Sequence, residues 1–249
     1  LGNKFLAHIR ECQAICHVVR AFKNNDIVRA DNKIEEDIIK QAKDDIDIIN
    51  LELQLADEET KAKIAAKRKK DPTDENIPYL TDKPVIYMFN VDESGLTDLD
   101  LQSKLRDLVA PAEAVFVNAK LEEEMSGMDR AERKEFLASY GVKHDALEEL
   151  IQAAYNTLGL QSFLTAGKKE CRAWTVRKGS TAPEAAGTIH TDFQRGFIAA
   201  SICNFKDLQE LGSEQAVKAA GKLRTEGKTY IMQDGDVVEY YFNVSKSNK

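Results

Sequence analysis

The chain has 249 residues, of which 43% are hydrophobic and 31% are charged, and its formal net charge is −7. This length predicts two domains in an ordinary soluble protein. No run of about 18 apolar residues occurs, so no membrane-spanning helix and no membrane partner are expected. The negative charge argues against a protein that binds nucleic acid over its whole surface, but it does not exclude a local basic patch. The four cysteines form no Cys-x-x-Cys pair and suit a reducing, cytoplasmic location.

The first third of the chain contains three recognisable segments. Residues 3–10 place apolar side chains at helical spacing, and residues 14–19 form a short apolar run that predicts a buried strand. Residues 44–55 have the composition of a helix with acidic residues in its first turn, where the helix dipole favours them. Residues 61–70 contain six basic residues and no acidic one. This basic run is either a solvated helix face or an arm that contacts phosphates.

The most informative stretch is residues 83–93, Lys-Pro-Val-Ile-Tyr-Met-Phe-Asn-Val-Asp-Glu. Its five consecutive apolar residues predict a strand that is buried on both faces, as in a parallel sheet. The strand ends on Asn90, and Asp92 and Glu93 follow. Ligands of open α/β sheets bind beyond the carboxyl ends of the strands. An amide beside a carboxylate can recognise the edge of a heterocyclic base there; the alternative is a turn that only ends a core strand.

Helices and strands alternate after this stretch. Residues 98–109 have the pattern of an amphipathic helix, and residues 114–117 predict a second buried strand that ends on Asn118-Ala119-Lys120. Residues 129–140 and 144–158 predict two further helices. The alternation indicates a doubly wound sheet with a ligand along its strand ends.

The composition changes near Gly159. Beyond it, short β-type runs alternate with glycine turns, and one helical segment is expected at residues 213–223. The predicted β-type runs are residues 171–176, 196–202, 229–232 and 237–244. This pattern predicts a small α+β domain with its boundary near Gly159.

Several of these stretches resemble the YchF, or Obg-like ATPase, subfamily of the Obg-family P-loop NTPases. Residues 1–6 resemble the continuation of the second switch region, and Asn90-Val-Asp-Glu93 is similar to the Asn-x-x-Glu base-recognition motif of one branch. Asn118-Ala119-Lys120 lies where the second base-contacting loop is expected. Residues 172–179, 182–193 and 221–236 closely resemble the TGS domain of this subfamily.

The resemblance implies an α/β P-loop NTPase-like domain with a mostly parallel sheet and a helical insertion, followed by a small α+β ubiquitin-like (β-grasp) TGS domain. It divides the chain into residues 1–44 and 79–158 for the nucleotide-binding domain, 45–78 for a remnant of the helical insertion, and 159–249 for the TGS domain. The implied base-binding residues are Asn90, Val91, Glu93, Asn118 and Ala119.

The chain also departs from the family pattern. The phosphate-loop motif Gly-x-x-x-x-Gly-Lys-[Ser/Thr] occurs nowhere in the sequence, and we expect it, with the Mg²⁺ ligands, upstream of Leu1. This chain alone is therefore expected to be inactive, and we can name no nucleophile or general base in it. Acidic Glu58-Glu59 passes directly to the basic run, which indicates that hairpin residues are missing near Thr60 and Lys61.

The implied function is a regulatory ATPase that also accepts GTP less well and associates with the ribosome, in translation or a stress response, as a monomer. In-line attack of water on the γ-phosphate is the implied reaction. Basic residues on and between the β-type runs are candidates for a surface that faces the ribosome or RNA, with a solvated sheet face as the alternative. These residues are Lys168, Lys169, Arg172, Arg177, Lys178 and Arg195. Two other interpretations are a non-catalytic adaptor for ribosomal RNA or protein, and a Rossmann enzyme, whose Gly-x-Gly-x-x-Gly motif is absent.

Overall fold

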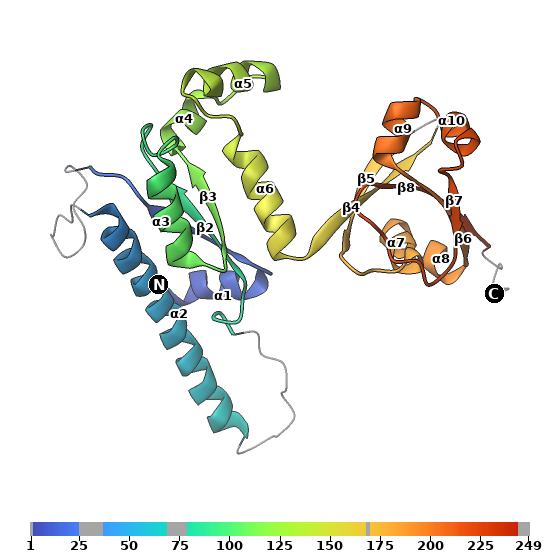
Figure 1. Cartoon of the computed structure of the whole chain (residues 1–249). Coiled ribbons are helices and arrows are strands. Elements are labelled where there is room, and N and C mark those ends of the chain that lie inside the picture. The colour runs from blue at the N-terminus through green and yellow to red at the C-terminus, as the bar shows by residue number, and fades with distance from the viewer. Residues whose placement is uncertain (1, 25–36, 69–78, 168–169, 244–249) are drawn as a thin grey trace. The chain divides into compact units, whose positions relative to one another are not determined.

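The computed structural model describes residues 2–24, 37–68, 79–167 and 170–243 (Figure 1). The chain divides into two compact units, Leu1–Leu158 and Gly159–Lys249. The division falls at the glycine where the composition changes. Within the described ranges, no helix combines the length and the hydrophobicity needed to cross a membrane.

The N-terminal unit is built on a three-stranded parallel sheet in the order β1-β2-β3. The strands are β1 (Ile15–Arg20), β2 (Val85–Asn90) and β3 (Glu113–Val117). The helices are α1 (Asn3–Glu11), α2 (Ile38–Arg68), α3 (Leu99–Val109), α4 (Ala119–Glu124), α5 (Arg130–Ser139) and α6 (Ala146–Thr157). The three predicted strands and the parallel sheet are confirmed, and the carboxyl ends of β1, β2 and β3 lie at one edge, since Arg20 pairs with Asn90 and Asn90 with Val117.

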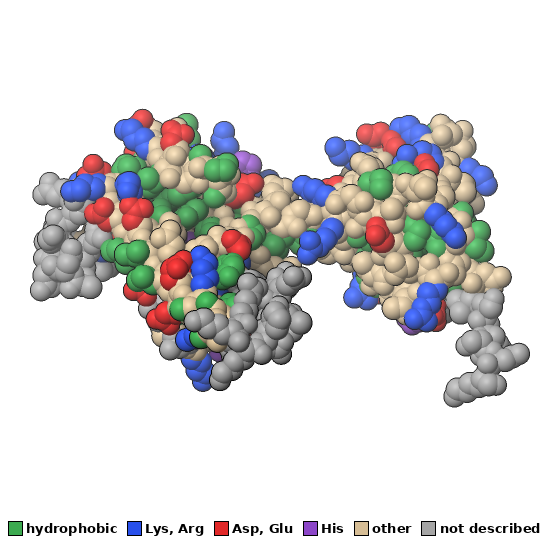
Figure 2. All heavy atoms as spheres, turned by 90° about the horizontal axis from the view of Figure 1, so that it is seen from below, with side chains coloured by type: hydrophobic (Ala, Val, Ile, Leu, Met, Phe, Trp, Pro, Cys, Tyr) green, Lys and Arg blue, Asp and Glu red, His purple; other side chains and the backbone are tan. Residues whose placement is uncertain are grey.

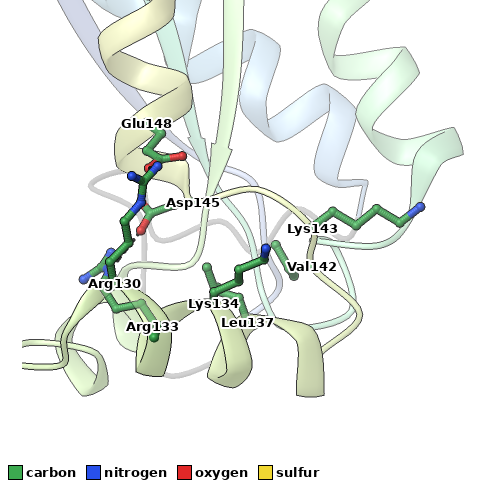
Figure 3. A pocket seen from close by; sticks show the side chains of 9 residues that line it. Arg130, Arg133, Lys134, Leu137, Val142, Lys143, Asp145 and Glu148 are labelled. Atoms are coloured by element: carbon green, nitrogen blue, oxygen red, sulfur yellow. Dashed lines mark hydrogen bonds and ion pairs between the residues drawn. The ribbon is translucent and has the colours of Figure 1, made fainter. Parts of the chain in front are cut away.

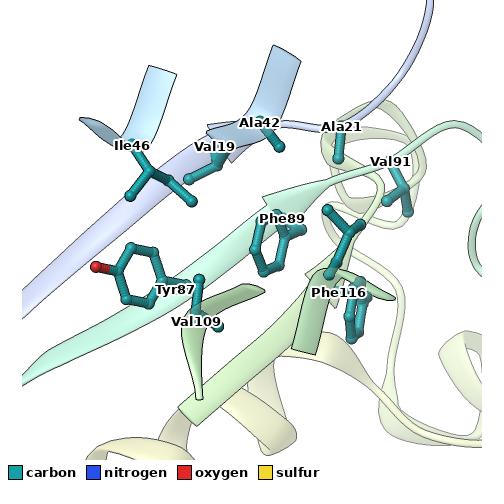
Figure 4. Packing of buried hydrophobic residues seen from close by; sticks show 10 residues of the cluster. Val19, Ala21, Ala42, Ile46, Tyr87, Phe89, Val91, Val109 and Phe116 are labelled. Carbon is teal, nitrogen blue, oxygen red and sulfur yellow. The ribbon is translucent and has the colours of Figure 1, made fainter. Parts of the chain in front are cut away.

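Helices cover both faces of this sheet, which explains the continuous apolar run of β2. On one face Phe89 is fully buried and stacks on Phe116, with ring centroids 5.6 Å apart (Figure 4). This core also includes Ala42 of α2 and Leu105 of α3. On the other face Ile86, Val115 and Ala153 of α6 form a separate cluster.

Helix α2 differs from the prediction at its start. It begins at Ile38, so the predicted domain boundary at residues 44–45 falls inside one helix. The reason is packing, because Ala42 and Ile46 on either side of that boundary belong to the core over the sheet. The helix also continues without a break through Thr60 and Lys61, where we expected missing residues.

The part of the basic run that is described continues α2. The Lys61 ammonium lies 2.8 Å from the Glu58 carboxylate, and Lys63 lies 3.7 Å from Glu59. This pairing favours the solvated helix face over the phosphate-contacting arm. Residues 69–70 lie outside the described residues.

The buried carboxylate of Asp57 links α2 to the rest of the unit by hydrogen bonds and an ion pair. Asp57, with 1% of its surface exposed, accepts hydrogen bonds from the backbone N–H groups of Leu80 and Thr81, both at 2.9 Å. It also accepts from the Thr81 hydroxyl at 3.0 Å and pairs with the Arg10 guanidinium of α1 at 3.2 Å. Burial acts to raise the pKa of Asp57, but these hydrogen bonds and the arginine outweigh it and hold the pKa below its usual value.

The C-terminal unit is a five-stranded mixed sheet in the order β5-β4-β8-β6-β7. Its strands are β4 (Leu160–Ala166), β5 (Cys171–Arg177), β6 (Phe197–Asn204), β7 (Arg224–Glu226) and β8 (Asp236–Phe242). Its helices are α7 (Ala182–Ile189), α8 (Thr191–Arg195), α9 (Phe205–Leu211) and α10 (Glu214–Ala219). The first and last strands, β4 and β8, lie parallel in the middle of the sheet. This agrees with the β-grasp arrangement that the resemblance implies.

Two expectations for this unit were wrong. The predicted β-type run at residues 229–232 forms only an isolated bridge, Thr181 with Ile231, and the edge strand is β7 instead. Three of the four described helices, α7, α8 and α9, were not predicted. A signal for α7 was present: Thr181 and Glu184 form a capping box around Pro183 at the helix start.

We predict that Asp57→Asn destabilises the N-terminal unit by about 1–3 kcal/mol at neutral pH, because donors around the carboxylate lose their acceptor. A carboxyl whose pKa is lowered by folding contributes stability above its ordinary pKa and loses it as the pH falls through the folded value. The difference between wild type and variant should therefore shrink below about pH 4. Urea unfolding followed by circular dichroism measures the free energy of unfolding of both proteins at each pH. The control is Asp47→Asn, which removes an exposed pair with Lys43 on the same helix and should have almost no effect; equal effects of the two changes would contradict the prediction.

Candidate functional site

A hollow of about 440 Å³ lies at the carboxyl ends of the strands in the N-terminal unit. It is lined by Phe22, Asn90, Val91, Asp92, Glu93, Ser94, Asn118 and Lys120. Four of the five predicted base-binding residues therefore lie around one cavity. The fifth, Ala119, is joined to it through its backbone.

Asn90 ties together the loops that follow the three strands. Its side-chain oxygen accepts a hydrogen bond from the N–H of Ala119, after β3, at 3.1 Å. Its carbonyl accepts from the N–H of Ala21, after β1, at 2.7 Å. Because the side-chain oxygen is already used, the amide nitrogen is the group left to donate to an acceptor on a ligand.

Val91 offers the cavity a single polar group. Its side chain is buried in the core, with 2% of the residue's surface exposed, and its N–H donates to the carbonyl of Val117 at 2.8 Å. Only its carbonyl, an acceptor, remains.

The two carboxylates after β2 have different roles. Asp92 accepts hydrogen bonds from the Ser94 hydroxyl and the Gly95 N–H, both at 2.8 Å, and so shapes the turn. Gly95 is required there, since a Cβ at this position would lie 2.8 Å from the Cβ of Val91. Glu93 is exposed at the cavity. Within the described part of the chain its carboxylate has no hydrogen-bond partner.

The loop after β3 contributes differently from the prediction. The Asn118 side chain accepts from the Leu121 N–H at 3.0 Å and caps α4, so its oxygen is not available to a base. Sequence reasoning named Lys120 only as part of this loop and missed Phe22, and both line the cavity. Phe22 follows β1 at the same sheet edge, which was the signal that it belongs to the site.

The structure does not bring the predicted basic residues together. Lys168 and Lys169 lie outside the described residues, and Arg172, Arg177, Lys178 and Arg195 are exposed. Arg172 and Arg177 lie five residues apart on β5, so strand alternation directs them to opposite faces. Figure 2 shows the Lys and Arg side chains of this unit spread over the visible surface.

Trp174, beside these basic residues, is a core residue rather than a stacking platform for bases. Its indole N–H donates to the Thr165 hydroxyl at 2.9 Å. The ring packs against the hydrophobic core between the sheet and α7. The Arg172 guanidinium covers the ring at 4.1 Å from its centroid.

A second hollow, of about 500 Å³, lies between α5 and α6 (Figure 3). Arg133 donates to Asp145 at 2.8 Å and to Glu122 at 2.9 Å, and Arg130 donates to Glu148 at 2.8 Å. These pairs neutralise both arginines and join the two helices, and Lys134 and Lys143 also line the hollow.

The described ranges contain no group of three or more His, Cys, Asp or Glu side chains placed to hold a metal ion. From the sequence we expect the Mg²⁺ ligands upstream of Leu1, and we derive no chemical step through a metal from the described residues.

We predict that Asn90→Ala frees the Ala119 amide, whose hydrogen exchange should accelerate about fivefold for a hydrogen bond worth about 1 kcal/mol. Asn90→Asp keeps an acceptor and should leave this exchange nearly unchanged. Exchange measured by NMR tests both variants. The control is Ser94→Ala, which alters the same cavity without touching Ala119; an unchanged exchange rate in Asn90→Ala would show that the bond does not join the two loops.

Known proteins resemble this chain over almost its whole length. Residues 160–243 match the YchF-GTPase_C family, which is described as a protein of unknown function. The ribosome-binding ATPase YchF of Bacillus subtilis is 39% identical over 287 residues, covering 98% of this chain and 77% of the relative. The Haemophilus influenzae protein of the same name is 40% identical over 284 residues, with the same coverage of 98% and 77%. Both alignments are longer than the 249 residues of this chain, so the relatives carry internal residues without counterparts here.

Two solved structures also resemble this chain. The YchF GTPase of Schizosaccharomyces pombe has a TM-score of 0.75 and 30% identity, covering 97% of this chain and 75% of that one. A GTP-binding protein of Pyrococcus horikoshii has a TM-score of 0.63 and 17% identity, covering 96% and 81%, and shows the fold alone. Given the identity and coverage of the relatives, the chain belongs to the YchF family within the Obg-type P-loop NTPases.

Proposed function

We propose that this protein binds and hydrolyses ATP, associates with the ribosome in the cytoplasm as a monomer, and recognises the adenine base in the hollow beyond β2 and β3. The observation that carries the proposal is the bond from the Ala119 N–H to Asn90, which closes two loops around this hollow. The relatives named ribosome-binding ATPases support the activity and the partner. We further propose that the C-terminal unit is a TGS domain.

The hydrogen-bonding groups left at the cavity favour adenine. The Asn90 amide nitrogen can donate to N7, which adenine and guanine share, so it does not distinguish them. The Val91 carbonyl can accept from the N6 amine of adenine. Guanine has an oxygen, O6, where adenine has the N6 amine. This oxygen and the Val91 carbonyl are both acceptors, so neither would receive a hydrogen bond from the other. An unpaired buried group costs about 1–3 kcal/mol, or roughly ten- to a hundredfold in affinity.

Hydrolysis would proceed by in-line attack of water on the γ-phosphate with electrostatic stabilisation of the transferring group. In this proposal the described residues supply the base site alone. We therefore propose that the phosphate loop and the Mg²⁺ ligands come from residues outside this sequence, and that residues 1–249 alone bind ATP weakly.

Ribosome association would use the face of the C-terminal unit that carries α7. Arg172 is directed to this face of β5, together with Trp174 and Val176, which pack against the α7 core. Arg195 ends α8, which packs against α7. In this proposal Arg172 and Arg195 would contribute to the contact, and Arg177, on the opposite face of β5, would not.

We predict that protein extended to include the phosphate loop binds ATP at least tenfold more tightly than GTP, because only adenine satisfies the Val91 carbonyl. Competition binding measures the ratio. Glu93→Ala serves as the matched variant: it should not reverse the preference, since Glu93 is exposed and the Val91 carbonyl is unchanged. Tighter binding of GTP by tenfold would contradict the proposal, and failure to bind either nucleotide would favour the non-catalytic adaptor.

A further inference from the structure

A hollow of about 780 Å³ lies within the C-terminal unit, on the face of the sheet opposite α7. Its lining comes from β6, β8, the end of β4 and the α9–α10 segment. Cys203, Leu208, Leu223 and Val237 give it an apolar floor and belong to a cluster distinct from the core under α7. An apolar floor can cover the methylene stem of a long side chain.

The charged side chains that line this hollow are both acidic. Glu214, at the start of α10, has no ion-pair or hydrogen-bond partner for its carboxylate among the described residues. Glu239 of β8 accepts a hydrogen bond from the Tyr241 hydroxyl at 3.0 Å. Burial raises the pKa of the Cys203 thiol; Glu214 and two aspartates, Asp207 and Asp236, add to this effect, and Arg224 opposes it.

An open strand edge borders the same hollow. β8 pairs with β6 along its whole length but with β4 at a single position, Leu164 with Val237. β4 ends at Ala166, and Ala166 and Gly167 line the hollow across from Glu239. Beyond Val237, the side of β8 that faces away from β6 is therefore not paired with any described strand. An extended segment can add there through backbone hydrogen bonds.

We propose that this hollow binds an extended, basic segment of a partner protein. A lysine or arginine of the segment would lay its stem over Leu208, Leu223 and Val237 and place its cation between Glu214 and Glu239. The backbone of the segment would pair with β8 beyond Val237. Charge decides between the classes of partner, because the phosphates of RNA would meet two carboxylates with no cation in the lining. The proposal does not depend on the nucleotide site, which lies in the other unit.

The test uses the full chain and a fluorescein-labelled decapeptide of alternating lysine and valine, measured by fluorescence anisotropy. Replacing both carboxylates, Glu214→Gln with Glu239→Gln, should weaken binding at least tenfold. The matched control, Glu170→Gln with Glu210→Gln, changes the net charge equally at exposed positions outside the hollow and should weaken binding less than twofold. Circular dichroism melting of both double variants confirms that they are folded.

A second measurement locates the peptide. Hydrogen exchange should show protection of the backbone of residues 239–242 when the peptide is bound. Equal weakening in the two double variants would mean that binding follows net charge alone, and would overturn the proposal. Unchanged affinity in the Glu214, Glu239 variant, or competition by a uridine oligonucleotide at the same hollow, would also overturn it.

Discussion

The hydrogen bond from the Ala119 N–H to the Asn90 side chain, at 3.1 Å, joins the ends of two parallel strands, and the proposed base site depends on it. The bond forms because β2 and β3 run in register, with Asn90 opposite Val117. The register is held in turn by Phe89 stacked on Phe116 in the core. A parallel sheet covered by helices on both faces thus brings two loops, 29 residues apart in sequence, to one cavity.

The hydrogen bonds already made inside the protein decide what this cavity can recognise. The oxygens of Asn90 and Asn118 and the N–H of Val91 all have partners. The amide nitrogens of Asn90 and Asn118, the Val91 carbonyl, the exposed Glu93 carboxylate and the Lys120 ammonium are left. This set matches the N7 and N6 groups of adenine. Nucleotide choice in this family member would then depend on the backbone conformation at Val91 more than on the length of the acidic side chain.

The sheet and its functional edge were predictable because apolar strands that end in polar residues carry a strong local signal. The polar end of the strand pointed to Asn90 and Glu93, the resemblance added Val91, and all three line the cavity. The sequence did not reveal that Asn118 caps α4, since asparagine is common both at helix N-caps and in ligand sites. Helix α2 begins at Ile38 because its first turns pack over the sheet. The composition of residues 44–55, on which the prediction depended, did not reveal this packing. The basic residues of the C-terminal unit were grouped by sequence distance, whereas strand alternation separates Arg172 from Arg177.

A structure of the protein with its phosphate loop, bound to a non-hydrolysable ATP analogue, tests the central claim most directly. Our account predicts the adenine in the hollow beyond β2 and β3, with its N6 amine within hydrogen-bonding distance of the Val91 carbonyl and its N7 facing the Asn90 amide nitrogen. A base that lies outside this hollow, or whose N6 amine contacts neither the Val91 carbonyl nor any group beside it, would contradict the account.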